Sequence, residues 1–294
     1  MPSLPPRSRA KARRLLAFLV AVALLTGCGA SSADDGSLEI VASFYPLTFA
    51  ASEVAGDAKV TDLTPAGAEP HDIELTARQV VAATEADLLL YLGGNFQPAV
   101  DELAASTEPS SLDALEELPL DDKRGADPHV WLDPRLMASI ADAVAARLAK
   151  IDPEDAHSYS QRALALSEDL GALDTEIRAG LEDCRRRELV VSHEAFGYLA
   201  DRYGLTQIGI AGLDPEAEPS PQRLAEVADY AREHDVTTIF FETLVSPRVA
   251  EALARETGAR VASLDPLEGA PERGDYFSAM RDNLEAIREG LGCT

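Results

Sequence analysis

Three of the chain's five histidines lie at predicted strand ends or in a stiff turn, which are places where side chains meet in an α/β protein. His71 lies in a loop after a strand, His129 in the turn "DPHVWLDP", and His193 at the end of a strand. Asp265 ends a further strand and stands directly before Pro266. Because the carboxyl ends of parallel strands meet in a crevice, we expect these four side chains to converge. Three imidazoles and one carboxylate suit Zn²⁺, which takes such donors tetrahedrally.

The turn around His129 is stiff. Pro128 and Pro134 each fix a backbone angle and push the preceding residue towards extended geometry. A metal-binding imidazole presents one ring nitrogen while an acceptor holds its other N–H. Asp127 and Asp133 are the predicted acceptors for His129.

Carboxylates also stand near the other two histidines. Asp72 and Glu74 are the predicted acceptors for His71. Glu194 and Glu242 are candidates as well, but the alternative of an ordinary surface or salt-bridging carboxylate is equally open for both.

Three further side chains are not expected to bind an ion. His157 and His234 fall within helical patterns beside acidic residues, which is typical of solvated surface positions. Trp131 is expected to pack under the turn and to exclude water from it.

The pattern of apolar runs predicts an α/β fold with mainly parallel sheets. From residue 38 onward, short strand-like runs alternate with helical patterns. The predicted strands are 38–44, 58–64 and 87–93 in the first half and 188–193, 206–212, 236–243 and 259–265 in the second. The predicted helices are near 46–55, 77–86, 97–106, 195–203, 221–234, 246–257 and 276–290. Two β/α lobes result.

One long, rigid helix is predicted to join the lobes over residues 153–184, with Asp152 as its cap and Pro153 in its first turn. Its apolar residues recur at steps of three and four, so one stripe faces protein. The stripe is Tyr159, Ala163, Leu166, Leu170, Leu173, Ile177 and Leu181. The alternative is a coiled-coil segment, which would need a partner chain. The lobes would then be 38–152 and 185–294.

The first 27 residues have the features of an export signal, with five basic residues before a short apolar run. "LTGC" resembles the lipobox of bacterial lipoproteins, which predicts acylation of Cys28 after cleavage. More than one acyl chain would hold the protein durably at a membrane surface. Residues 28–37 are small and polar, as in a flexible tether.

The charge balance is strongly acidic. Without residues 1–27 the chain has 21 basic and 51 acidic residues, a net charge of −30. Nucleic acid and anionic membrane surfaces are therefore excluded as expected partners. The negative charge could serve to attract cations, but it could equally serve solubility or reflect a salty habitat.

Two cysteines remain after processing, Cys184 and Cys293. Disulfides persist outside the cytoplasm, so we expect these two to be bridged, although a pair of free thiols is the alternative. A bridge across so long a loop would stabilise the fold by about 4–5 kcal/mol in the chain-entropy model.

Four ordered segments resemble the metal-receptor lipoproteins of bacterial ABC importers, on their zinc branch. They are "PAGAEPHDIELTARQV", "DPHVWLDP", "VVSHEAFGYLADRYGL" and "ETGARVASLDPL". The resemblance implies two lobes joined by a rigid helix, capture of a divalent metal between them, and delivery to a membrane permease. It also implies a monomeric, extracytoplasmic protein anchored to the cell membrane. His71, His129, His193 and Asp265 match ligand positions, and a histidine at position 193 favours zinc over manganese or iron.

The sequence departs from this family in two places. Some zinc receptors have a glutamate directly before the first histidine, whereas this chain has Pro70, which leaves Asp265 or a water to complete the ligand set. Many relatives also carry a histidine-rich loop in the first lobe, but the segment before "DPHVW" contains no histidine.

An enzyme is the main alternative of another class. "HEAFG" begins like the zinc-protease motif HExxH, but the second histidine is replaced by Gly197. A hydrolytic zinc needs an open position and a general base, and Glu194 is the residue that could be proposed for that role. We expect a binding protein without catalytic residues, with a manganese or iron receptor as the nearer alternative. No motif indicates surface adhesion.

Overall fold

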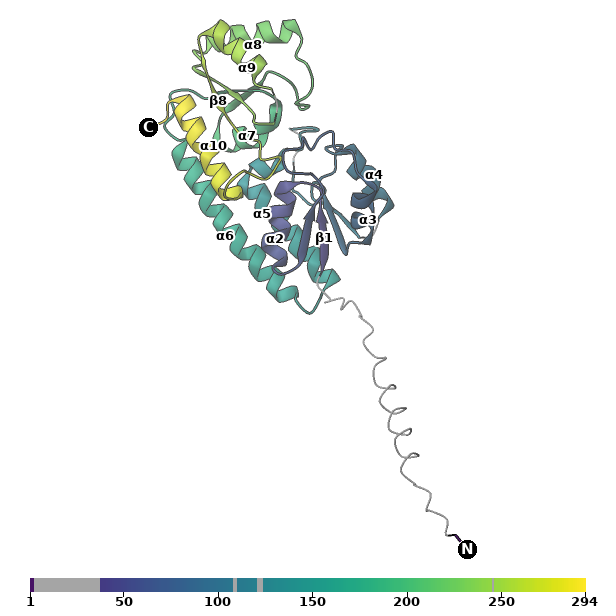
Figure 1. Ribbon diagram of the computed structural model, residues 1–294. Helices are drawn as coiled ribbons and strands as arrows, with labels where there is room; N and C mark the ends of the chain where they lie inside the picture. Colours follow the sequence, from purple (N-terminus) through teal and green to yellow (C-terminus); the bar gives the residue numbers. More distant parts are fainter. Residues whose placement is uncertain (3–37, 108–109, 121–123, 245) are drawn as a thin grey trace. The chain divides into compact units, whose positions relative to one another are not determined.

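Residues 1–2, 38–107, 110–120, 124–244 and 246–294 are described by the computed structural model (Figure 1). The predicted signal peptide beyond its first two residues, the acylation of Cys28 and the predicted tether lie outside them. Leu38–Thr294 forms one compact unit. Within the described ranges, no helix has both the length and the apolar composition needed to span a bilayer.

The first sheet has four parallel strands in the order β2-β1-β3-β4. They are β1 (Glu39–Ala42), β2 (Lys59–Asp62), β3 (Leu88–Tyr91) and β4 (Ser111–Asp113). Ile40 pairs with Val60 on one side and with Leu88 on the other. The sequence predicted the first three strands but not β4, which is only 3 residues long.

The second sheet repeats this order as β6-β5-β7-β8, again with parallel strands. They are β5 (Glu188–Val191), β6 (Thr206–Gly209), β7 (Thr238–Phe241) and β8 (Arg260–Ser263). All four were predicted, and each is shorter than its apolar run. We call the parts of the chain around the two sheets the first and the second lobe.

The central strands of both sheets are buried on both faces, as in most parallel sheets. Ile40 lies in the largest apolar cluster, and Val41 lies in a smaller cluster on the opposite face. In β5, Leu189 lies in the same largest cluster and Val190 in another on the far side. The largest cluster therefore continues from the first sheet to the second.

Helices cover these faces in two sets (Figure 1). Those with buried residues in the largest cluster are α2 (Tyr45–Ala55), α5 (Pro134–Ile151), α6 (Ala156–Gly180), α7 (Gly197–Tyr203) and α10 (Tyr276–Leu291). Those on the outer faces are α3 (Ala77–Glu85), α4 (Pro98–Ser106), α8 (Pro221–Glu233) and α9 (Arg248–Thr257). Two short 3₁₀ helices, η1 (Val130–Leu132) and η2 (Glu194–Phe196), precede α5 and α7.

Helix α6 runs along both lobes, as predicted for the linking helix (Figure 1). All residues of its predicted stripe are buried. Its predicted start was wrong, because the helix begins at Ala156 rather than at Pro153. Asp152 instead ends α5, and its carboxylate accepts a hydrogen bond from the Tyr159 hydroxyl at 2.9 Å.

Helix α5 was not predicted, although its sequence carries the necessary signals. Asp133 caps it by accepting from the backbone N–H of Arg135 at 2.8 Å, and Pro134 occupies its first turn. Buried Met137, Ile140, Val144 and Leu148 then recur at steps of three and four. The stiff turn that holds His129 is thus also the start of a long helix.

The predicted disulfide joins Cys184 to Cys293 across a sequence separation of 109 residues. The two residues also form an isolated antiparallel bridge through their backbones. The end of α10 is therefore fastened to the segment that follows α6.

Burial along α6 leads to a stability prediction. Leu170 is 0% exposed and Leu164 is 61% exposed on the same helix. Leu170→Ala should lower the free energy of unfolding by about 2–5 kcal/mol, because it leaves a cavity in the core. Leu164→Ala is the matched control and should change it by less than about 0.5 kcal/mol. Urea unfolding of both variants checks this, and equal losses would contradict the described packing.

Candidate metal site

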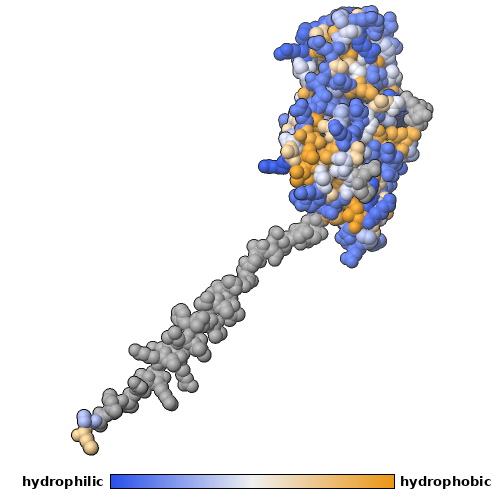
Figure 2. Space-filling model, turned by 90° about the vertical axis from the view of Figure 1, so that its right-hand side faces the viewer, coloured by the Kyte–Doolittle hydropathy of each residue, from blue (hydrophilic) through white to orange (hydrophobic). Residues whose placement is uncertain are grey.

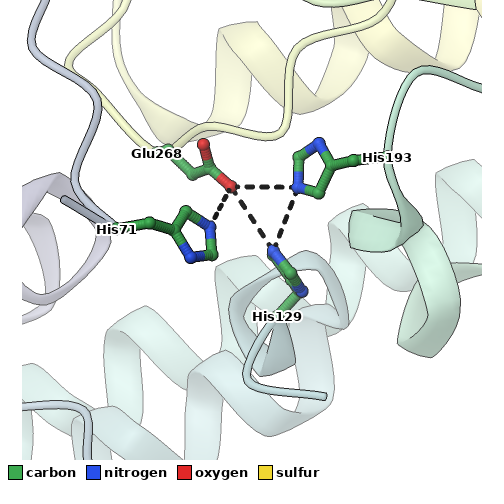
Figure 3. A group of neighbouring side chains, drawn as sticks. All are labelled: His71, His129, His193 and Glu268. Atoms are coloured by element: carbon green, nitrogen blue, oxygen red, sulfur yellow. Dashed lines mark hydrogen bonds and ion pairs between the residues drawn. The ribbon is translucent and has the colours of Figure 1, made fainter. Parts of the chain in front are cut away.

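Three histidines and one glutamate from both lobes point towards a common centre (Figure 3). They are His71, His129, His193 and Glu268, and the ligand atoms that they offer lie within 4.8 Å of one another. The structure thus brings together the three histidines selected from the sequence. It gives them a carboxylate other than Asp265.

The spacing of the donor atoms around Glu268 Oε1 is close to that around a tetrahedral ion. Glu268 Oε1 lies 3.3 Å from Nε2 of His71 and 3.4 Å from Nε2 of both His129 and His193. The last two nitrogens are 3.2 Å apart. Donors bound to zinc at about 2.0–2.1 Å in a tetrahedron are separated by about 3.3–3.4 Å. Four of the six donor pairs therefore have this spacing, and the two pairs between His71 and the other histidines lie within 4.8 Å.

His129 is held by the residue two positions before it. Asp127 Oδ1 accepts from the His129 backbone N–H at 3.0 Å and lies 2.8 Å from ring Nδ1. This local turn fixes the backbone and the ring together, and it leaves Nε2 directed at the other ligands. The side chain of His129 is fully buried.

His193 is held from the neighbouring strand. It follows β5, and Glu242 follows β7, which pairs with β5 in the second sheet. Glu242 Oε2 lies 2.7 Å from His193 Nδ1, and Oε1 accepts from the His193 backbone N–H at 3.3 Å. The parallel pairing of the two strands therefore positions both the ligand and its acceptor.

His71 lies on the loop between β2 and α3 and is the most exposed of the four side chains, at 13%. Its ring packs edge-on against Phe96, with centroids 4.6 Å apart. Glu69 Oε1 accepts from its backbone N–H at 3.1 Å. The buried Gln97 amide donates to the carbonyl of Pro70 at 3.2 Å, which holds the loop against the first lobe.

The other predicted acceptors have different roles. Asp133 caps α5 and pairs with Arg202, and Glu194 faces Arg223 at 3.7 Å. Asp72 and Glu74 are exposed. Of the six carboxylates selected from the sequence, only Asp127 and Glu242 therefore contact a ligand histidine in the part of the chain that the structure describes.

Asp265 does not reach the group, because its carboxylate is used in a turn. Asp265 Oδ1 accepts from the backbone N–H of Leu267 at 2.8 Å, and its backbone is paired with the Asn283 side chain. Leu267 has a positive φ of 55°, which turns the chain so that Glu268 points inward. The choice of Asp265 is corrected to Glu268, three residues later in "DPLEG". The clue in the sequence was a second carboxylate on the same strand-end loop.

The carboxylates raise the proton affinity of the imidazoles. Burial alone favours neutral rings, but hydrogen bonds with Glu242 and Glu268 outweigh it and raise the pKa of His193 to about 10. In the same way, Asp127 and Glu268 raise the pKa of His129 against the effect of its burial. Although Glu268 is buried, the three histidines hold its pKa well below the usual range. Without an ion, the site therefore retains protons that a metal must displace.

Two carboxylate oxygens here are buried without a hydrogen-bond partner among the described residues, Glu69 Oε2 and Glu268 Oε2. Burial and the nearby charge of Glu268 raise the pKa of Glu69 to about 8. Unsatisfied buried acceptors are costly, and a bound cation would offset that cost. The donor set and these oxygens both fit a divalent metal.

Comparison with known proteins agrees with this fold. Residues 40–290 match the family described as zinc-uptake complex component A, periplasmic (ZnuA), and the chain belongs to that family. It is 33% identical to the zinc-binding protein AdcA of Streptococcus pyogenes, over 86% of this chain and 56% of that protein. The chain thus spans little more than half of that curated relative.

Two further relatives match over nearly their whole length. The high-affinity zinc uptake system protein ZnuA of Bacillus subtilis is 31% identical, over 91% of this chain and 94% of that protein. The crystal structure of the Zn(II)-bound ZnuA-like domain of Streptococcus pneumoniae AdcA superposes with a TM-score of 0.76 at 34% identity. That match covers 87% of this chain and 99% of the domain.

The raised pKa of His193 predicts how stability depends on pH in the absence of metal. A group whose pKa rises from 6.5 to about 10 on folding stabilises the fold fully below 6.5, and this contribution is lost as the pH rises through 10. The free energy of unfolding of chelator-treated protein should therefore fall between pH 7 and pH 10. Urea unfolding across this range measures it. His193→Gln is the control and should fall less steeply; identical slopes would contradict the assignment.

Proposed function

We propose that this chain is an extracytoplasmic receptor that captures Zn²⁺ between its two lobes and delivers it to an ABC importer for zinc uptake. The observation that carries the proposal is the convergence of three imidazole nitrogens on one carboxylate oxygen at 3.3–3.4 Å, with all four donors within 4.8 Å of one another. The family and the zinc named in its relatives support it. The ion is cargo, so the site must both bind and release it.

The donor set favours zinc over manganese or iron. Three of the four donors are imidazoles, whereas manganese prefers a shell rich in oxygen and six ligands. Ni²⁺ and Cu²⁺ also accept nitrogen donors. The affinity of such a site for divalent metals generally rises from Mn²⁺ through Ni²⁺ to Cu²⁺ and is lower again for Zn²⁺. Selection of zinc would therefore depend on the tetrahedral geometry and on supply.

The site is better suited to holding an ion than to catalysis with one. The protein supplies donors for all four positions of a tetrahedral ion, whereas a hydrolytic zinc keeps one position open for water. Glu194, the only base that the sequence suggested, is paired with Arg223 instead. We therefore propose a binding protein without catalytic residues.

The proposed location follows from the first 37 residues and from the family. A cleaved signal peptide, an acylated Cys28 and a short tether would place a monomeric receptor outside the cytoplasm on the membrane. The periplasmic description of the family supports an extracytoplasmic site. The expected partner there is the permease of the importer.

Metal titration tests the proposal directly. Metal-stripped protein should bind about one Zn²⁺ per chain, more tightly than Mn²⁺ in competition, and more weakly in acid as the histidines protonate. Isothermal titration with a competing chelator measures all three properties. Failure to bind zinc would contradict the proposal, and tighter binding of Mn²⁺ would assign the chain to a manganese receptor.

A pair of variants tests which carboxylate is the ligand. Glu268→Gln removes the anionic donor and should weaken zinc binding by more than the roughly 10–100-fold that loss of a supporting group costs. Asp265→Asn is the matched control, because the amide oxygen can still accept from Leu267, and its affinity should stay near that of the wild type. The reverse order of the two affinities would restore Asp265 as the ligand.

A further inference from the structure

Helix α7 of the second lobe lies against the segment of the first lobe that carries His129. We call Arg124–Asp133 the His129 segment. The Tyr198 hydroxyl donates to the carbonyl of Asp127 at 3.2 Å, and Arg124 Nε donates to Asp201 at 2.7 Å. Arg202 Nε lies 3.1 Å from Asp133 Oδ1. Three side chains of one short helix therefore hold both ends of this segment.

The start of α7 lies very close to the His129 segment. A Cβ atom added to Gly197 would lie 2.5 Å from Asp127 Oδ2 and 2.6 Å from a guanidinium nitrogen of Arg124. The backbone of Gly197 is ordinary α-helix, with φ −60° and ψ −48°, so its conformation does not require glycine. The need for glycine comes from contact with Asp127, the carboxylate that orients His129.

Arg202 connects this contact to the linking helix. Its guanidinium donates to both oxygens of Asp174 on α6, at 2.7 and 2.9 Å, and also meets Asp133. The three side chains are 11–22% exposed. A planar guanidinium can serve two carboxylates at fixed angles, which a lysine cannot do. Arg202 thus joins α6, α7 and the cap of α5 at one point.

We infer that Arg202 is a positioning residue of the metal site, which fastens the His129 segment to the second lobe. His193 precedes α7 by only the three residues of η2, so α7 closely follows one histidine of the group and contacts the segment that bears another. Their Nε2 atoms then keep a separation of 3.2 Å before an ion arrives. Groups held in place in advance bind with a smaller loss of conformational entropy. The inference rests on the proposed function, since it assigns part of the zinc affinity to this contact.

A second set of hydrogen bonds connects the His129 segment to the loop that carries Glu268. The Trp131 indole N–H donates to the carbonyl of Pro266 at 2.7 Å, two residues before Glu268. The Tyr276 hydroxyl donates to the carbonyl of Trp131 at 2.6 Å. The His129 segment therefore meets the second lobe on two sides, whereas His71 is held within the first lobe.

The test compares Arg202→Met with Arg178→Met in the full chain. Arg178 also approaches Asp174, at 3.5 Å, but it is 56% exposed and does not contact the His129 segment. In metal-stripped protein, hydrogen exchange of residues 124–133 should be faster for Arg202→Met and unchanged for Arg178→Met. Zinc affinity should fall about tenfold or more for Arg202→Met only. The visible absorption of bound Co²⁺ should shift in that variant as its tetrahedral geometry relaxes.

Two further variants separate positioning from a general loss of stability. Arg202→Lys keeps the charge but loses the planar fork that binds Asp174 through two N–H groups, so its affinity should lie between those of the wild type and Arg202→Met. Gly197→Ala removes no ion pair, and alanine favours a helix, yet its methyl group should displace Asp127 and weaken zinc binding. Affinity equal to the wild type in Arg202→Lys or Gly197→Ala would overturn the inference.

Each failure has its own signature. If hydrogen exchange of residues 124–133 is unchanged in Arg202→Met, Arg202 does not hold the His129 segment against the second lobe, whatever the zinc affinity. Faster exchange with unchanged zinc affinity would overturn the positioning role. Absence of zinc binding by the wild type would instead refute the proposed function, and with it the role of Arg202 in that function.

Discussion

A single buried carboxylate oxygen, Glu268 Oε1, gathers three imidazoles from three separate segments within 3.3–3.4 Å. The surrounding structure must position these rings and satisfy their remaining polar atoms. Two of the three rings are fully buried, so each needs its second nitrogen satisfied, and Asp127 and Glu242 do this. The cluster lies where the two lobes meet, so it also couples their positions.

The two sheets place the ligands by a shared topology. Both have the same strand order, and in each the two central strands connect to strands on opposite edges of the sheet, so the carboxyl ends of the central pair form a topological switch point. His193 and Glu242 emerge at that point in the second sheet, after β5 and β7. The first lobe supplies its ligands from loops, at His71 after β2 and at His129 before α5. The second lobe also supplies Glu268 from a loop, the one that follows β8.

The sequence predicted the parts that local chemistry determines. Strand ends and paired prolines identified the three histidines, and the period of α6 identified its buried stripe. Glu268 could not be separated from Asp265, because the choice depends on the positive φ of Leu267 and on Asn283, which comes from α10. Helix α5 was predictable from its cap and its periodicity. The contacts of Arg202 join residues far apart in the sequence, so no local pattern could indicate them.

In the proposed receptor, the ion and protons compete for the same buried donor atoms. Its carboxylates raise the proton affinity of His129 and His193, so in the absence of metal the buried charges are balanced by protons. A metal then replaces protons rather than filling an uncompensated anionic cavity, and the fold does not depend on the ion for charge balance. The same carboxylates that orient the rings raise their basicity, so the proton competes with the metal for the ring nitrogens. In the proposed receptor, release would follow from return of protons to the imidazoles or from separation of His71, the most exposed of the four side chains, from the other three.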